Sequence, residues 1–241
     1  MATFWIRSAV LTALTVACVQ AQSATVTLTG WAFGSGNHVK TTTYEGAAGG
    51  FMGSLSGTGA TDTSNFVTYC IELSEFFSFS SSGMSSYAVV DGASYFHSRG
   101  RGAGTADRLG RLLTFVAQDP TRVDSAAEST AMQLAVWNTV YDSDWSLSTS
   151  SAYRDFTASA AYRSHADMLL TGALGITHSR FDVFALQRAG SQDFLLATER
   201  PVDDPNRVPE PASMALVAVA LAGLGLTRRR QVSRAGGPAT A

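Results

Sequence analysis

The chain has 241 residues, a formal net charge of −2 and 45% hydrophobic residues. Its charges are dispersed and form no basic stripe, which argues against a nucleic-acid-binding protein. Lys40 is the only lysine, and Ser, Thr, Gly and Ala dominate, a composition that suits an extracellular β-rich protein.

The N-terminus has the order of a secretory signal peptide. Arg7 precedes an apolar run over residues 9–19, and the small residues Ala21 and Ala24 follow. We expect a signal peptide over residues 1–24, cleaved after either alanine. A buried N-terminal helix is the alternative.

Period-2 alternation predicts strands in the first part of the chain. The expected strands cover residues 25–33, 39–44, 65–73 and 87–90. In 65–73, one face would hold Val67, Tyr69, Ile71 and Leu73, and the other Phe66, Thr68, Cys70 and Glu72. Residues 46–64 are rich in Gly, Ser and Thr, which predicts loops and short edge strands with Phe51 and Leu55 pointing inward.

Helices are expected in the middle of the chain. They cover residues 107–117, 125–141 and 152–170, with a Gly/Arg loop over 98–104 before the first. Ser125 and Glu128 form a capping box that starts the second helix, and Gly172 closes the third. Because apolar residues surround most of the second helix, we expect it to be largely buried.

Two final strands are expected over residues 181–187 and 193–198. Strands, then a helical insert, then strands again predict a β-rich α+β domain over residues 25–200. Its core would be a β-sandwich or barrel with an inserted helical subdomain.

The C-terminus combines a proline-containing tripeptide, an apolar stretch and a basic cluster. These are Pro209, Glu210 and Pro211, then residues 212–227, then Arg228, Arg229 and Arg230. The apolar residues 212–226 would form a helix of roughly 23 Å, at a rise of about 1.5 Å per residue. Bilayer thinning and snorkelling would let it span a hydrocarbon core of about 30 Å. The arginines should stay cytoplasmic, which places the body of the protein outside.

This order resembles the PEP-CTERM sorting signal of Gram-negative bacteria. The resemblance implies recognition of residues 209–230 by an exosortase-type processing enzyme, with only transient membrane insertion. The mature protein would then reach the cell surface or the extracellular matrix. Residues 201–208 would be a linker and 231–241 a cytoplasmic tail. A plain C-terminal anchor is the alternative.

Cysteine usage singles out Cys70. Cys18 ends the apolar run of the signal peptide, and the residues before it lack the leucine of a lipoprotein signal. If Cys18 is removed with the signal peptide, Cys70 remains alone in an exported protein. A single cysteine there suggests intermolecular pairing or a reactive thiol, and an inert buried thiol is the alternative.

Gln133 is the unusual residue of the predicted buried helix. An unsatisfied buried amide costs on the order of 1–3 kcal/mol, so it needs a partner or a purpose. A thiolate can attack the glutamine carbonyl and expel ammonia, which leaves a thioester. That reaction needs a thiol and a carboxamide pressed together with water excluded. Tyr69 and Trp137 are large enough to shield such a bond.

Two stretches resemble the paired signatures of bacterial thioester domains. They are Tyr69-Cys70-Ile71-Glu72 and Met132-Gln133-Leu134-Ala135-Val136-Trp137. Met132 replaces the family's threonine, and Glu72 replaces the commoner aspartate. The resemblance implies a β-core with a helical subdomain, a Cys70–Gln133 cross-link and covalent capture of amine-bearing surfaces or matrix polymers.

Two other functions stay open. A structural matrix or biofilm protein would keep this packing without a reactive bond. A cysteine hydrolase would pair Cys70 with His97, His165 or His178, although nothing in the spacing selects one of them. We expect no enzyme and no cofactor, because no nucleophile signature surrounds Cys70. We expect no metal site, because the histidines and carboxylates form no ligand pattern.

Overall fold

The computed structural model describes residues 22–59, 62–76, 79, 85–142, 144–147 and 158–201. Most of the predicted signal peptide, all but the first residue of the predicted linker, and the sorting signal and tail lie outside these residues. Within the described part, no helix is both long and apolar enough to cross a membrane.

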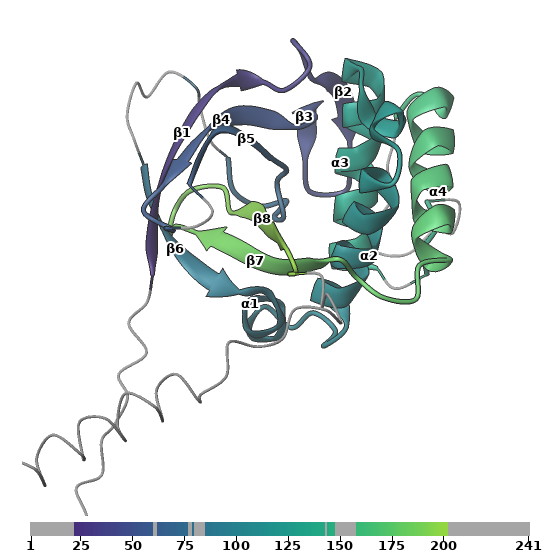
Figure 1. The fold of residues 1–241 in the computed structure, drawn as a ribbon. Coiled ribbons are helices and arrows are strands. Elements are labelled where there is room, and N and C mark those ends of the chain that lie inside the picture. The colour runs from purple at the N-terminus through teal and green to yellow at the C-terminus, as the bar shows by residue number, and fades with distance from the viewer. Residues whose placement is uncertain are drawn as a thin grey trace, which may run out of the picture. The chain divides into compact units, whose positions relative to one another are not determined.

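Six antiparallel strands form a curved, nearly closed sheet (Figure 1). In the order across the sheet they are β5 (Thr63–Thr68), β4 (Phe51–Ser56), β1 (Ser23–Trp31), β6 (Ser85–Asp91), β7 (Phe181–Gln187) and β8 (Phe194–Glu199). Just beyond β5, the chain reaches the start of β8. There the Leu195 amide donates to the Tyr69 carbonyl (2.9 Å) and the Ile71 amide to the Asp193 carbonyl (3.1 Å). We call residues 69–71 and 193–195 the barrel closure.

A separate two-stranded hairpin pairs β2 (Asn37–Lys40) with β3 (Glu45–Ala48). It is joined to helix α3 (Ala126–Tyr141) by side-chain hydrogen bonds. The Thr130 hydroxyl donates to the Ala48 carbonyl (2.7 Å), and the amide of Gly50, just after the hairpin, donates to the Ser129 hydroxyl (2.7 Å). The hairpin is therefore held one turn before Gln133.

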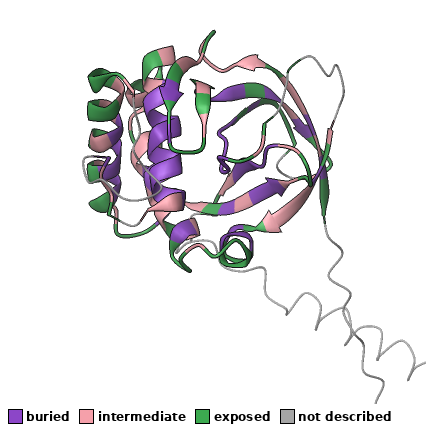
Figure 2. Cartoon of the chain, turned by 180° about the vertical axis from the view of Figure 1, so that it is seen from behind, coloured by how far each residue is buried: buried purple, intermediate pink, exposed green. Residues whose placement is uncertain are grey.

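Within the described residues, all helices lie between β6 and β7 in the sequence. Besides α3 they are α1 (Gly92–Ser98), α2 (Thr105–Ala117), α4 (Ala160–Leu174) and the 3-10 turn Pro120–Val123. Helix α3 packs against the hairpin and the barrel closure on one side and against α4 on the other, so it is buried along most of its length (Figure 2). Figure 2 also shows exposed residues along the outer side of α4.

The β-rich class with helices inserted between strands is confirmed, and the nearly closed sheet corresponds to the barrel rather than the sandwich. The capping box is confirmed as well. The Ser125 hydroxyl accepts from the Glu128 amide, and the Glu128 carboxylate accepts from the Ser125 amide. Phe51 and Leu55 are buried as expected.

The strand predicted over 65–73 is wrong beyond Thr68. Val67 is 50% exposed, whereas every residue from Thr68 to Leu73 is buried. The alternation fails because residues 69–73 leave the sheet partner β4 and lie against β8 and α3. Residues 69–73 are therefore buried on both sides, whereas an ordinary strand alternates between a buried and an exposed face.

Other boundaries also differ. Residues 41–44 form the hairpin turn, in which the Thr41 amide donates to the Tyr44 carbonyl, instead of continuing a strand. Helix α1 was not expected. Helix α4 begins at Ala160 and continues past Gly172, whose missing side chain leaves room for the ring of Phe115: an added Cβ would lie 2.1 Å from it.

Candidate functional site

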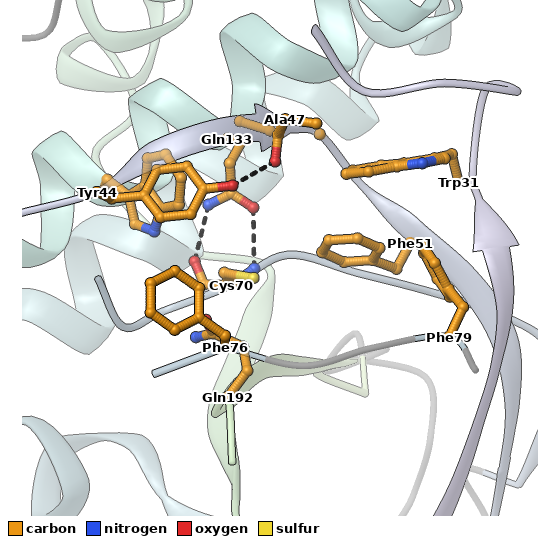
Figure 3. Close-up of a pocket in the computed structure, with 12 residues that line it drawn as sticks. Trp31, Tyr44, Ala47, Phe51, Cys70, Phe76, Phe79, Gln133 and Gln192 are labelled. Atoms are coloured by element: carbon orange, nitrogen blue, oxygen red, sulfur yellow. Dashed lines mark hydrogen bonds between the residues drawn. The ribbon is translucent and has the colours of Figure 1, made fainter. Parts of the chain in front are cut away.

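The structure brings Cys70 and Gln133 together. The Cys70 amide donates to the Gln133 Oε1 atom (2.9 Å), and the Gln133 Nε2 atom donates to the Cys70 carbonyl (2.8 Å). Both residues are buried, with Gln133 1% and Cys70 7% exposed. The Gln133 carboxamide is thus paired, through both its oxygen and its nitrogen, with the backbone of Cys70, as Figure 3 shows.

Each partner is positioned by a different part of the fold. Cys70 belongs to the barrel closure and forms an isolated β-bridge with Phe194 at the start of β8. Gln133 lies in the middle of α3, two turns after the capping box. The two hydrogen bonds therefore attach the central helix to the barrel closure.

The Cys70 thiol is free and deeply buried. Burial raises the pKa of this thiol well above its ordinary value, so the thiol is protonated at neutral pH. A thiol of this kind reacts slowly with external reagents. It can still react with a neighbouring group that the fold holds in contact with it, because the reaction is then intramolecular.

A cavity of about 200 Å³ opens beside this pair. It is lined by Trp31, Tyr44, Ala47, Ala48, Gly49, Phe51, Cys70, Phe76, Phe79, Gln133, Trp137 and Gln192. Apart from Tyr44 and Cys70, none of these described residues carries an ionisable side chain. The cavity is therefore lined mainly by apolar groups, together with the Cys70 thiol and the carboxamides of Gln133 and Gln192.

Aromatic rings form two walls of the cavity, on either side of Cys70 and Gln133 (Figure 3). On one side the Trp31 ring lies 4.7 Å from Phe51 and 5.7 Å from Phe79, centroid to centroid. On the other side the Tyr44 ring lies 5.3 Å from Trp137 and 6.0 Å from Phe76.

Tyr44 is the residue through which the hairpin reaches the cavity. Its hydroxyl donates to the Ala47 carbonyl (2.5 Å). Burial, with a smaller contribution from nearby Cys70, raises the pKa of Tyr44 to about 12. The hydroxyl thus stays neutral, and the ring acts as an apolar cover.

The two residues expected to shield the bond lie in different places. Trp137 is 2% exposed and lines the cavity. Tyr69 is also buried, but it lines a second cavity of about 400 Å³ together with Phe66, Met132 and Leu195. Tyr44 takes the place that the sequence assigned to Tyr69. The signal for Tyr44 was weak, because its hairpin is distant in sequence from both motifs.

None of the three candidate histidines lines the cavity within the described part of the chain. His97 and His178 are exposed, and His165 contacts the carbonyl of Arg122 (2.8 Å).

Three carboxylates, from Glu72, Glu75 and Asp193, have oxygen atoms within 4.8 Å of one another next to the barrel closure. The Arg99 guanidinium bonds two of them, Glu72 (3.0 Å) and Asp193 (2.9 Å). The group is therefore an ion-pair cluster in this structure.

Comparison with protein families identifies the C-terminal segment. Residues 207–230 match the PEP-CTERM protein-sorting motif, and this range includes the tripeptide at 209–211 and the arginines at 228–230. Neither the comparison with curated proteins nor that with solved structures found a match. The motif marks the chain as an exported exosortase substrate with a surface or extracellular location.

Proposed function

We propose that the mature protein is a surface or matrix protein that attaches covalently to amine-bearing partners through a Cys70–Gln133 thioester. One observation carries the proposal: the Gln133 carboxamide is fixed on the backbone of Cys70 beside an aromatic cavity. The resemblance of both motifs to bacterial thioester domains supports it. Intact-mass measurement tests it, as argued in the Discussion.

Formation of the cross-link would convert the side-chain amide of Gln133 into a thioester with Cys70. The Cys70 sulfur attacks the Gln133 side-chain carbonyl carbon, and the carbon–nitrogen bond breaks. The thiol proton leaves with the amide nitrogen as ammonia. The Cys70 amide already donates to the carbonyl oxygen (2.9 Å), so it would stabilise the negative charge that develops on this oxygen.

Attachment would then consume the thioester. A neutral primary amine attacks the same carbonyl carbon, the carbon–sulfur bond breaks, and Cys70 leaves as a thiolate that takes up a proton. An amide between Gln133 and the partner remains. Because one protein molecule makes one bond, this is acyl transfer without turnover, and we do not propose an enzyme.

The second candidate is a structural surface or matrix protein without a reactive bond. The same two hydrogen bonds favour it, because they satisfy the buried Gln133 amide without any reaction. In that case Gln133 would serve to attach α3 to the barrel closure. The measured mass separates the two candidates, since this one predicts no loss of ammonia.

Replacing Tyr44 by Ala should speed hydrolysis of the bond. The Tyr44 ring covers the cavity beside Trp137, and its removal admits water to the acyl carbon. We expect hydrolysis roughly tenfold faster in Tyr44→Ala, followed as the gain of one water by mass spectrometry. Tyr44→Phe keeps the ring and should match the wild-type rate. Equal rates in Tyr44→Ala and Tyr44→Phe would show that the hairpin does not protect the bond.

The mature protein should begin at Gln22 and end near residues 209–211. Ala24 is 1% exposed and pairs with Tyr87 of β6, so cleavage after Ala24 would remove paired residues of β1, whereas cleavage after Ala21 leaves them intact. Sequencing both termini of the protein from its native host checks this. Recovery of the arginines at 228–230 in the surface-exposed protein would contradict exosortase processing.

A further inference from the structure

The segment after Cys70 is fixed although it is not part of a regular strand. The Ile71 amide donates to the Asp193 carbonyl (3.1 Å), and the Leu73 amide donates to the Tyr141 hydroxyl (2.9 Å). The Glu72 carbonyl accepts from the Gln192 side chain (3.1 Å). Two separate regions, helix α3 and residues 192–193, therefore hold the backbone that follows Cys70.

The fully buried carboxylate of Asp193 lies next to this segment. Asp193 is 0% exposed, and its Oδ2 atom accepts from the Tyr95 hydroxyl (2.7 Å) and from Arg99 Nη2 (2.9 Å). Its Oδ1 atom accepts from the Arg188 amide (2.8 Å). Burial raises the pKa of Asp193, and these hydrogen bonds and the Arg99 charge oppose the rise.

Arg99 joins the two sides of the barrel closure. Its Nη1 atom donates to the Glu72 carboxylate (3.0 Å), while Nη2 holds Asp193. Glu72 follows Cys70 by two residues, and Asp193 precedes Phe194, the β-bridge partner of Cys70. One guanidinium therefore bonds both segments that meet at the closure.

The Arg99 charge offsets the repulsion between the Glu72 and Asp193 carboxylates. Without Arg99, the Glu72 and Asp193 carboxylates would face each other in a buried place, with Glu75 close by. The Oε2 atom of Glu72 has no hydrogen-bond partner among the described residues. Like charges at this distance repel, and burial weakens the screening.

We propose that Arg99 is a positioning residue for bond formation. By holding Glu72 and Asp193 together, it keeps the Cys70 backbone in register with Gln133, so that the sulfur and the carboxamide carbon stay aligned. This inference rests on the proposed thioester. A misplacement of about 1 Å can slow a reaction by about a hundredfold, so loss of Arg99 should slow the reaction strongly.

The test follows ammonia loss by mass spectrometry after the protein is refolded from denaturant. Arg99→Met, which removes the charge, should lower the first-order rate by at least about tenfold, and Arg99→Lys should recover part of it. Arg180→Met is the matched control, because it removes an exposed arginine just before β7 that pairs with Glu199 at the end of β8 (2.6 Å). Its rate should equal that of the wild type.

Leu169→Ala tests whether a loss of global stability alone slows the loss of ammonia. It should lower the unfolding temperature through a buried residue of α4 while keeping the wild-type rate. If Arg99→Met does not refold, Glu72→Gln decides in its place, with an expected rate several-fold below wild type. Ammonia loss at the wild-type rate in the deciding Arg99 or Glu72 variant overturns the positioning role. A wild-type protein that loses no ammonia refutes the thioester itself.

Discussion

Purified protein without its terminal signals should weigh one ammonia less than its sequence requires. The Gln133 carboxamide is held against Cys70 by hydrogen bonds of 2.9 and 2.8 Å, and the cavity beside them is apolar. Proximity and exclusion of water are the two conditions for forming and keeping a thioester. Intact-mass spectrometry under native and denaturing conditions measures the loss.

The loss should disappear in Cys70→Ala and in Gln133→Ala. Asn138→Ala is the matched control, because Asn138 is another buried amide of α3 whose side chain bonds the Ser146 carbonyl (2.9 Å) instead of Cys70. It should still lose one ammonia. A wild-type protein at its full sequence mass, with a Cys70 thiol that titrates on unfolding, would refute the thioester and support the structural function.

Patterns local in sequence predicted most of the secondary structure. The capping box at Ser125 located the start of α3 because both of its partners lie within one helical turn. The last two strands, β7 and β8, also lie within one residue of their predicted bounds. The end of β5 was wrong because residues 69–73 are buried by β8 and α3, which are distant in sequence.

In the candidate site, too, some residues could be identified from local sequence, whereas others depend on contacts between segments that are distant in sequence. Cys70 and Gln133 could be paired from the sequence because each is chemically unusual in its surroundings. Tyr44 could not be assigned to the cavity, since its position depends on hydrogen bonds between the hairpin and α3. The sequence places Arg99 only in the Gly/Arg loop over residues 98–104. Its role appears when α1 places it between Glu72 and Asp193.

Replacing Phe194 by Ala should destabilise the protein strongly and expose Cys70. The ring is 0% exposed and lies 5.9 Å from Phe51 and 5.8 Å from Tyr87, centroid to centroid. Removing such a ring typically costs about 3–5 kcal/mol of the free energy of unfolding. Because Phe194 is also the bridge partner of Cys70, the resulting cavity lies at the barrel closure. Denaturant unfolding measures the cost.

Alkylation of Cys70 measures the local effect, in a Gln133→Ala background where the thiol stays free. Leu169→Ala in the same background is the control: Leu169 is equally buried in α4, and its loss should cost about 2–5 kcal/mol. We expect faster alkylation in the Phe194 variant at matched stability, because only Phe194→Ala adds further space next to the thiol beyond that of the shared background. Equal rates would mean that Cys70 reacts through global unfolding, so that packing at the closure does not itself protect the thiol.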